Sequence, residues 1–183
     1  MHQAQLFPFC GMNFAFRAQA LPALYFPPMG EGSPFARFDD IWAGLVLQKA
    51  LPAAGLLVTT GEPFVRHVRA SDPFRNLVRE APGVEANELV WRLLRDAQVP
   101  AGDLAGAVAW LADYLRRSVN FDQLRGRPLT AYLGRWGDNL AAWLRVCQAV
   151  FVARKASLDD LGPGVVPRQL TAPDTDLARG GDA

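Results

Sequence analysis

The sequence predicts an α/β fold that has few strands and continues into an α-helical extension. Three observations support this prediction. Apolar and polar residues alternate with period two from Met12 to Arg17, which is typical of a strand. The run GLLVTT, rich in β-branched residues and bounded by Gly55 and Gly61, indicates a second short strand. After Pro82 the apolar residues recur at helical spacing, which predicts packed helices.

In the first 84 residues, short strands and loops are expected around a helix, with a second helical start near the end of this part. A strand over 10–16 is followed by a loop, because the 17 residues PALYFPPMGEGSPFARF hold four prolines and two glycines. A helix is expected over 41–51, ending before Pro52. A third strand is expected over 64–68, before a turn at Ser71-Asp72-Pro73 and then a helical start.

The helical part is expected over 85–156, with helices at 87–97, 101–119 and 130–155. The second helix carries one apolar stripe, formed by Leu104, Val108, Leu111, Leu115 and Val119. The third has an apolar face formed by Leu133, Trp136, Leu140, Trp143 and Leu144. From 157 to 183 the chain is rich in proline, glycine and aspartate without periodicity, which predicts a disordered tail.

Composition narrows the classes of function. The chain has 183 residues, half of them apolar, and a formal net charge of +1, so no strong field recruits nucleic acid or an anionic membrane. No stretch reaches the roughly 18 apolar residues that a membrane-spanning helix needs. Its two cysteines, Cys10 and Cys147, lie far apart and indicate no disulfide framework. We therefore expect a cytoplasmic protein without a membrane span or nucleic-acid partner.

Two adjacent aspartates, Asp39 and Asp40, precede the first predicted helix. One interpretation is structural, because an aspartate at this place accepts bonds from free backbone N–H groups and favours the positive end of the helix. This explains one aspartate better than two, since adjacent carboxylates repel each other. The other interpretation is a ligand site, beside a glycine-containing loop that lets a ligand approach the backbone.

A single histidine, His67, follows the third predicted strand and lies between Arg66 and Arg69. A lone histidine is most often a surface or packing residue, although neutral imidazole is also a common metal ligand. No Ser-His-Asp order, paired-cysteine zinc spacing or phosphate-binding loop accompanies it.

Three sequence blocks together resemble a known family. The blocks are LFPFCGMNFAF, ALYFPPMGEGSPFARFDDIWAG and TTGEPFVRHVRASDPFRNLVRE, spread over Gln5 to about Leu94. In their order and rare residues they resemble the reversibly glycosylated polypeptides, the UDP-arabinopyranose mutase family. More broadly, they resemble the second half of a GT-A glycosyltransferase. The resemblance implies a partial GT-A half-domain over 1–84, followed by the helical extension.

The resemblance also implies an activity and a site. The family are isomerases that use UDP-sugars with Mn²⁺ or Mg²⁺ and interconvert the pyranose and furanose rings of UDP-L-arabinose. By the resemblance, Asp39 and Asp40 are catalytic and His67 is a metal ligand. The expected substrate-binding residues are Gly11, Asn13, Gly32 and Trp42.

Much of the family's pattern is expected to be missing from this chain. In the family the uridine-binding strands, the Asp-rich metal motif and the self-glycosylated arginine precede FPFCGMN, and here about five residues precede it. The isolated chain is therefore expected to be inactive, as the acceptor-side half of a site that an N-terminal-half or homologous polypeptide completes. The alternatives are a non-catalytic interaction subunit that binds a homologous mutase, or a degenerate fragment.

Overall fold

A computed structural model describes residues 6–30, 32–61, 72–121, 124 and 126–159. The chain divides into two compact units, Met1–Ala149 and Val150–Ala183. In the second unit the described residues are 150–159, the last part of a long helix. Of the disordered tail expected over 157–183, residues 157–159 belong to this helix, and 160–183 lie outside the described residues. Everything below concerns the first unit.

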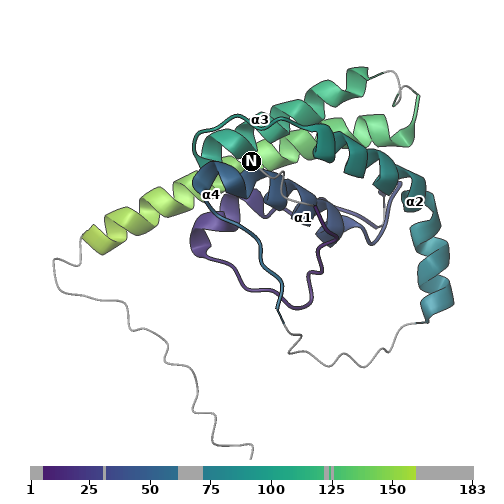
Figure 1. Cartoon of the computed structure of the whole chain (residues 1–183), viewed down its shortest axis with the longest axis horizontal. Helices are drawn as coiled ribbons and strands as arrows, with labels where there is room; N and C mark the ends of the chain where they lie inside the picture. Colours follow the sequence, from purple (N-terminus) through teal and green to yellow (C-terminus); the bar gives the residue numbers. More distant parts are fainter. Residues whose placement is uncertain (1–5, 31, 62–71, 122–123, 125, 160–183) are drawn as a thin grey trace, which may run out of the picture. The chain divides into compact units, whose positions relative to one another are not determined.

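The α/β prediction, with its GT-A half-domain, is wrong, because the described residues form helices and no strand (Figure 1). Four α-helices are present: α1 (Asp39–Ala50), α2 (Pro73–Asp96), α3 (Leu104–Arg117) and α4 (Pro128–Asp159). Short 3-10 helices accompany them among the described residues, at Ala18–Ala23, Leu51–Ala54 and Ser118–Asn120. None of the four long helices, over the described residues, combines the length and apolar character needed to cross a membrane.

The first two expected strands fail for a common reason. A strand needs a neighbour to receive its backbone hydrogen bonds, and the described residues offer none to the segments 10–16 and 56–60. The alternating side chains are also not buried on one face, since Met12 is 62% exposed and Phe16 is 46% exposed. Period two in the sequence therefore marks an irregular segment here. The third expected strand, 64–68, lies outside the described residues.

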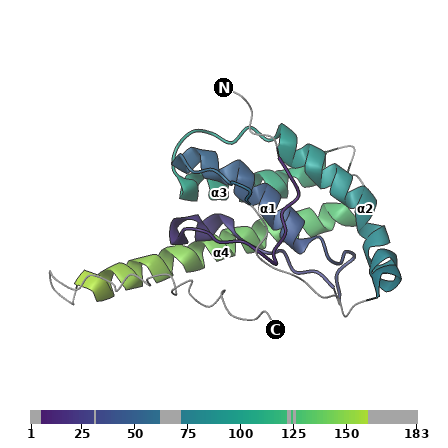
Figure 2. The same ribbon diagram turned by 60° about the horizontal axis from the view of Figure 1, so that its bottom comes forward.

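Helix α1 lies at the centre of the first unit. It packs against α2, α3 and the 3-10 helices before and after it. Eight of its residues are buried, on every side of the helix: Trp42, Ala43, Gly44, Leu45, Val46, Leu47, Gln48 and Ala50. A helix that is apolar all round belongs in a core, which agrees with the short apolar run that predicted it. Figure 2 shows α1 beside α3, with α2 along one end of both.

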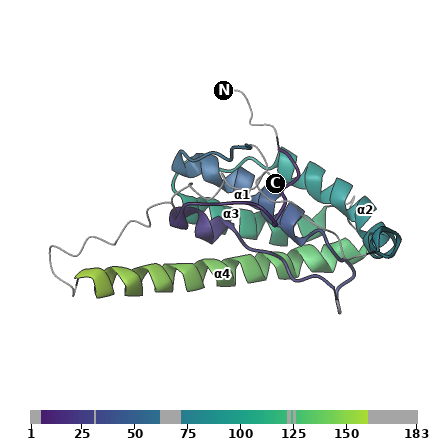
Figure 3. The same cartoon turned by 90° about the horizontal axis from the view of Figure 1, so that it is seen from below.

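The helices predicted by period 3.6 are confirmed. On α3 the buried residues include Leu104, Val108, Leu111 and Leu115, four members of the predicted stripe. On α4, Leu133, Trp136, Leu140 and Leu144 are buried, and Trp143 is half-buried. Figure 3 shows α1 and α3 on the same side of residues 128–149 of α4. These faces therefore enclose one core.

Helix α2 joins the helical start expected after Pro73 to the helix expected over 87–97. Asp72 caps it by accepting the N–H groups of Phe74 and Arg75, and Pro73 occupies the first helical position, where proline is favoured. The helix continues through Pro82. It therefore runs across residues 84 and 85, where the sequence placed a domain boundary. The boundary expected at 156 lies within α4.

Candidate functional site

The Asp40 carboxylate joins the N-terminal segment to the start of α1. Its Oδ2 accepts the backbone N–H of Gly11 at 2.9 Å, and its Oδ1 accepts the N–H of Ile41 at 2.8 Å. A Cβ on Gly11 would lie 3.2 Å from the Cβ of Asp40, so a small residue suits this approach. Gly11 and Asp40 come from separate blocks of the sequence, and the fold brings them together.

Two further contacts fix the same segment along α1, at Gly44 one turn after Asp40 and at Gln48 two turns after it. The Gln48 side chain accepts the N–H of Phe7 at 3.0 Å and donates to the carbonyl oxygen of Phe7 at 2.9 Å. Between these anchors Phe9 lies on Gly44, where an added Cβ would be 2.0 Å from the Cβ of Phe9. The segment 7–11 is thus fixed along α1 although it has no regular structure.

Asp40 is therefore a structural residue in this fold, and its removal should be costly. We expect Asp40→Ala to lower the free energy of unfolding by about 1–2 kcal/mol, because two backbone N–H groups lose their acceptor. Urea unfolding followed by circular dichroism measures this loss. The matched control is Glu88→Ala, an exposed carboxylate on α2, for which we expect a change within about 0.5 kcal/mol. Equal stability of the two variants would contradict the structural role.

The Asp39 carboxylate has a different environment. Asp39 is the first residue of α1, with Phe38 before it providing no side-chain cap. No hydrogen bond from the described residues reaches its half-buried side chain. Its negative charge acts on Tyr132 of α4: burial raises the pKa of the Tyr132 phenol most, and the charges of Tyr25 and Asp39 raise it further. Asp39 therefore lies within electrostatic reach of Tyr132 on α4.

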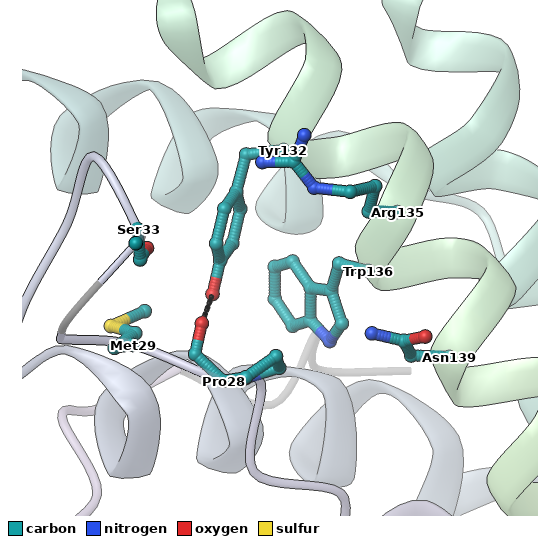
Figure 4. A pocket seen from close by; sticks show the side chains of 8 residues that line it. Pro28, Met29, Ser33, Tyr132, Arg135, Trp136 and Asn139 are labelled. Carbon is teal, nitrogen blue, oxygen red and sulfur yellow. Dashed lines mark hydrogen bonds between the residues drawn. The ribbon is translucent and has the colours of Figure 1, made fainter.

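A cavity of about 250 Å³ lies between the loop 28–33 and α4 (Figure 4). From α4 it is lined by Tyr132, Arg135, Trp136 and Asn139, which follow one another at helical spacing. The loop adds Pro28, Met29, Gly32 and Ser33. Gly32 has a φ of +76°, a left-handed conformation that favours glycine, and this allows the loop to turn beside the cavity.

Behind the cavity wall, Trp136 packs against another aromatic side chain, Trp42. The indole of Trp42 is fully buried and stacks on that of Trp136, with ring centroids 5.8 Å apart. Its N–H donates to the Oδ1 of Asn87 at 3.0 Å. Because its surface and its only donor are both occupied, Trp42 positions Trp136 and does not itself face a ligand.

A second, wider hollow of about 900 Å³ lies on the N-terminal segment. It is lined by residues 7–10 and 13–17, by Leu47 and Leu51 of the core, and by residues 55–61. Asn13 is exposed here, together with Phe14 and Phe16. We call this hollow the N-terminal groove. Asn13 thus lines a different hollow from Gly32, although both were predicted to bind substrate.

The predicted metal ligand His67 lies outside the described residues. Among the residues that the structure does describe, no group of three or more His, Cys, Asp or Glu side chains could hold a metal ion. Asp39 and Asp40 are adjacent, but both oxygens of Asp40 already accept backbone N–H groups. The described residues therefore do not by themselves fit a divalent ion.

Comparison with known proteins identifies the family. The sequence profile described as Reversibly glycosylated polypeptide matches residues 1–146, most of the chain. This chain belongs to the reversibly glycosylated polypeptide family. The resemblance predicted from the three sequence blocks is thereby confirmed, and the match extends beyond them into α4.

Curated relatives of this family member include UDP-arabinopyranose mutases of plants. UDP-arabinopyranose mutase 1 of Oryza sativa subsp. japonica is 42% identical over 142 residues, which are 76% of this chain and 37% of the rice protein. UDP-arabinopyranose mutase 1 of Arabidopsis thaliana is 34% identical over 140 residues, 76% of this chain and 38% of the relative. Probable UDP-arabinopyranose mutase 1 of Solanum tuberosum is 42% identical over 164 residues, 89% of this chain and 44% of the relative. The chain thus spans less than half the length of these relatives.

Four residues that line the cavity from α4 were not among the site residues predicted from the sequence. Trp136 was assigned to the apolar face of its helix, and Tyr132, Arg135 and Asn139 were not considered. Their spacing of three and four residues places polar and aromatic side chains on one face of α4. Polar residues beside aromatic ones, on a helix face expected to be apolar, are the sequence signal that could have indicated these four residues.

Proposed function

We propose that this chain is a UDP-sugar mutase-related protein that holds one side of a nucleotide-sugar site and needs a second polypeptide for activity. The observation that carries the proposal is the half-buried Asp39 carboxylate, which has no hydrogen bond with the described residues and acts on Tyr132 beside a cavity. This arrangement occurs within the part of the chain that the family profile matches. The names of the plant relatives suggest UDP-arabinopyranose as the substrate.

A free carboxylate is suited to the chemistry of ring interconversion. When the bond at the anomeric carbon breaks, positive charge develops on the sugar ring, and a nearby carboxylate stabilises it. The same carboxylate can accept hydrogen bonds from sugar hydroxyl groups and hold the ring for reclosure. We assign this role to Asp39 and the structural role to Asp40, which ties the site to the N-terminal segment.

A second polypeptide is supported by the surface of this chain. The match covers 37% of the rice mutase. The N-terminal groove is lined by exposed apolar side chains, including Phe14, Phe16 and Leu57. Exposed apolar surface of this kind marks interaction sites. We propose that a homologous polypeptide, or one equivalent to the unmatched part of a mutase, covers it.

The divalent ion, Mn²⁺ or Mg²⁺, is also part of the proposal. No group of three or more His, Cys, Asp or Glu side chains among the described residues could hold the ion, and we propose that the second polypeptide supplies its carboxylate ligands. A cytoplasmic location completes the proposal. Its support is that both cysteines are free, with Cys10 exposed on the surface, as is usual in a reducing compartment.

A mixing experiment tests the need for a second polypeptide. The purified chain is combined with the part of the rice mutase that lies outside the match, and conversion of UDP-arabinopyranose to the furanose form is followed by chromatography. We expect no turnover by either component alone and measurable turnover by the mixture, which EDTA abolishes and Mn²⁺ restores. Turnover by the isolated chain would show that the site is complete without a partner.

A non-catalytic interaction subunit is the second candidate. The start of α2 favours it, because Phe74, Leu77 and Val78 are all strongly exposed and lie on one face at helical spacing. The mixing experiment separates the two candidates. Formation of a stable complex without turnover, under conditions where the intact rice mutase is active, would favour the interaction subunit.

A further inference from the structure

Met29 accepts a backbone hydrogen bond through its thioether sulfur. Its Sδ lies 3.3 Å from the backbone nitrogen of Phe38, whose N–H donates to it. Phe38 is 8% exposed, so water has little access to this residue. A leucine at position 29 would fill a similar volume but would offer the N–H no acceptor. The sulfur of Met29 therefore ties the loop 28–33 to the residue that precedes α1.

Neighbouring residues fix the backbone on both sides of Met29. The carbonyl oxygen of Pro28 accepts the Tyr132 hydroxyl at 3.0 Å. The N–H of Gly30 donates to the carbonyl oxygen of Phe35, also at 3.0 Å. Figure 4 shows Met29 next to Pro28, on the loop side of the cavity. The bond from Phe38 to the sulfur is thus made from a fixed stretch of the loop.

The backbone is strained at Arg37, immediately before Phe38. Arg37 has a φ of +68°, a left-handed conformation that glycine adopts freely and that costs other residues free energy. The other left-handed residues among the described ones are all glycines: Gly30, Gly32, Gly55 and Gly126. Contacts on either side hold the turn, because Arg37 pairs with Glu80 of α2 and Phe38 donates to Met29. A chemical change at Met29 therefore acts on a turn that stores strain.

Small polar molecules reach Met29 through the cavity. Met29 is half-buried and lines the cavity of about 250 Å³ between the loop and α4. A water molecule needs only about 10–15 Å³ of such a cavity, and hydrogen peroxide is little larger than water. The cavity therefore gives a peroxide a route to this side chain.

Peroxides oxidise a thioether without any other reactant. A lone pair of the sulfur attacks one oxygen of hydrogen peroxide, an S–O bond forms, and the O–O bond breaks. The proton on the transferred oxygen passes to the departing hydroxide, which leaves as water. The sulfur is oxidised to a sulfoxide and the peroxide is reduced to water.

We propose that Met29 is a site of oxidation by peroxides, and that its oxidation releases Phe38 at the start of α1. A sulfoxide accepts hydrogen bonds through its oxygen, and a separation of 3.3 Å leaves no room for that oxygen between sulfur and nitrogen. The bond from Phe38 is therefore lost. Asp39 and Asp40 follow Phe38 directly, so the change reaches the acidic pair. Methionine sulfoxide reductases reverse it. The inference goes beyond the proposed function and does not depend on it.

The experiment treats the folded full chain with hydrogen peroxide. The chain carries Cys10→Ser and Met12→Leu, because both of the original side chains are exposed and would also react. Tandem mass spectrometry locates the added oxygen, and NMR follows amide hydrogen exchange. We expect Met29 to gain one oxygen and the Phe38 amide to exchange about 3- to 10-fold faster, the effect of losing one hydrogen bond. Reductases for the two sulfoxide epimers should restore the original rate.

An internal control and a matched variant make the test specific. The Phe7 amide, which donates to Gln48 two turns along α1, should exchange at the same rate before and after oxidation. Met29→Leu in the same background keeps the volume but removes the sulfur. Its Phe38 amide should exchange faster from the start and should not respond to peroxide.

Any of three results would overturn the proposal. The first is a Met29 that stays reduced in the folded parent chain while Met12, which is 62% exposed, is fully oxidised. The second is oxidation of Met29 that leaves the exchange of the Phe38 amide unchanged. The third is an equal response of the Phe7 amide, or of the Met29→Leu variant. The measurement needs neither a second polypeptide nor UDP, so its outcome is independent of the mixing experiment.

Discussion

Replacing Gly137 by alanine should force α3 away from α4 and lower the free energy of unfolding by about 2–3 kcal/mol. A Cβ at this position would lie 2.5 Å from the backbone oxygen of Ala112 and 2.9 Å from the Cγ of Arg116. A side chain could rotate away from such a clash, but the carbonyl of Ala112 belongs to the backbone of α3. The helices must therefore separate, which opens the core that both faces enclose. Alanine's higher helix propensity, worth about 1 kcal/mol, offsets part of the cost.

Thermal and urea unfolding followed by circular dichroism measure this loss, and we expect a midpoint lower by roughly 5–10 °C. The matched control is Gly102→Ala, which makes the same chemical change just before α3. Nothing lies within 4 Å of a Cβ there, so its effect should stay within about 0.5 kcal/mol. Equal midpoints for the two variants would mean that α3 and α4 do not approach as closely as the structure shows.

The sequence predicted the helices well because their signal is local. On α3 the residues Leu104, Val108, Leu111 and Leu115 recur at the period of a helix, and all four are buried. The sequence indicated a helical start after Pro73 but did not join it to the helix expected over 87–97, because Pro82 lies between them. In the structure Gly83 is needed for packing, since an added Cβ would lie 2.4 Å from the ring of Phe38. The packing of Phe38 on Gly83 thus explains why a glycine, which locally resembles a helix end, lies inside α2.

The strands were predicted wrongly because pairing is not local. Alternation from Met12 to Arg17 describes which way side chains can point, but a strand also needs a neighbouring backbone. The described residues supply none, and the segment is fixed instead by side chains of α1, Asp40 and Gln48. Nothing in a single sequence distinguishes an extended segment held by side chains from one held in a sheet.

The sequence predicted the side of the candidate site at the start of α1 but not the side on α4. Family resemblance indicated Asp39, Asp40 and Gly11, and the fold brings Asp40 to Gly11. The opposite wall, on α4, comes from a helix about 90 residues further along the chain, and only the fold shows that it lies beside the loop containing Gly32. Trp42 was predicted to bind substrate from the family resemblance. Its complete burial instead makes it a support for Trp136.

Replacing Asp39 by asparagine should leave the chain folded and remove most activity of the reconstituted enzyme. The side chain has no hydrogen bond with the described residues, so the expected loss of stability is the interaction of its charge with the start of α1, about 0.3–1 kcal/mol. Asparagine keeps the shape but cannot stabilise positive charge on a sugar ring. If Asp39 acts as proposed, turnover in the mixture should fall about 100- to 1,000-fold.

The comparison with Asp40 makes this prediction specific. Asp40→Ala loses two backbone contacts and should lose stability, whereas Asp39→Asn should lose turnover at nearly constant stability. Glu88→Gln removes an equal charge from an exposed position on α2 and should change neither quantity. Chromatographic assay of UDP-arabinopyranose conversion in the mixture, together with urea unfolding of each variant, separates these effects. Full turnover with Asp39→Asn would reduce both aspartates to structural residues at the start of a helix, and the proposed catalytic role would then have no support in the structure.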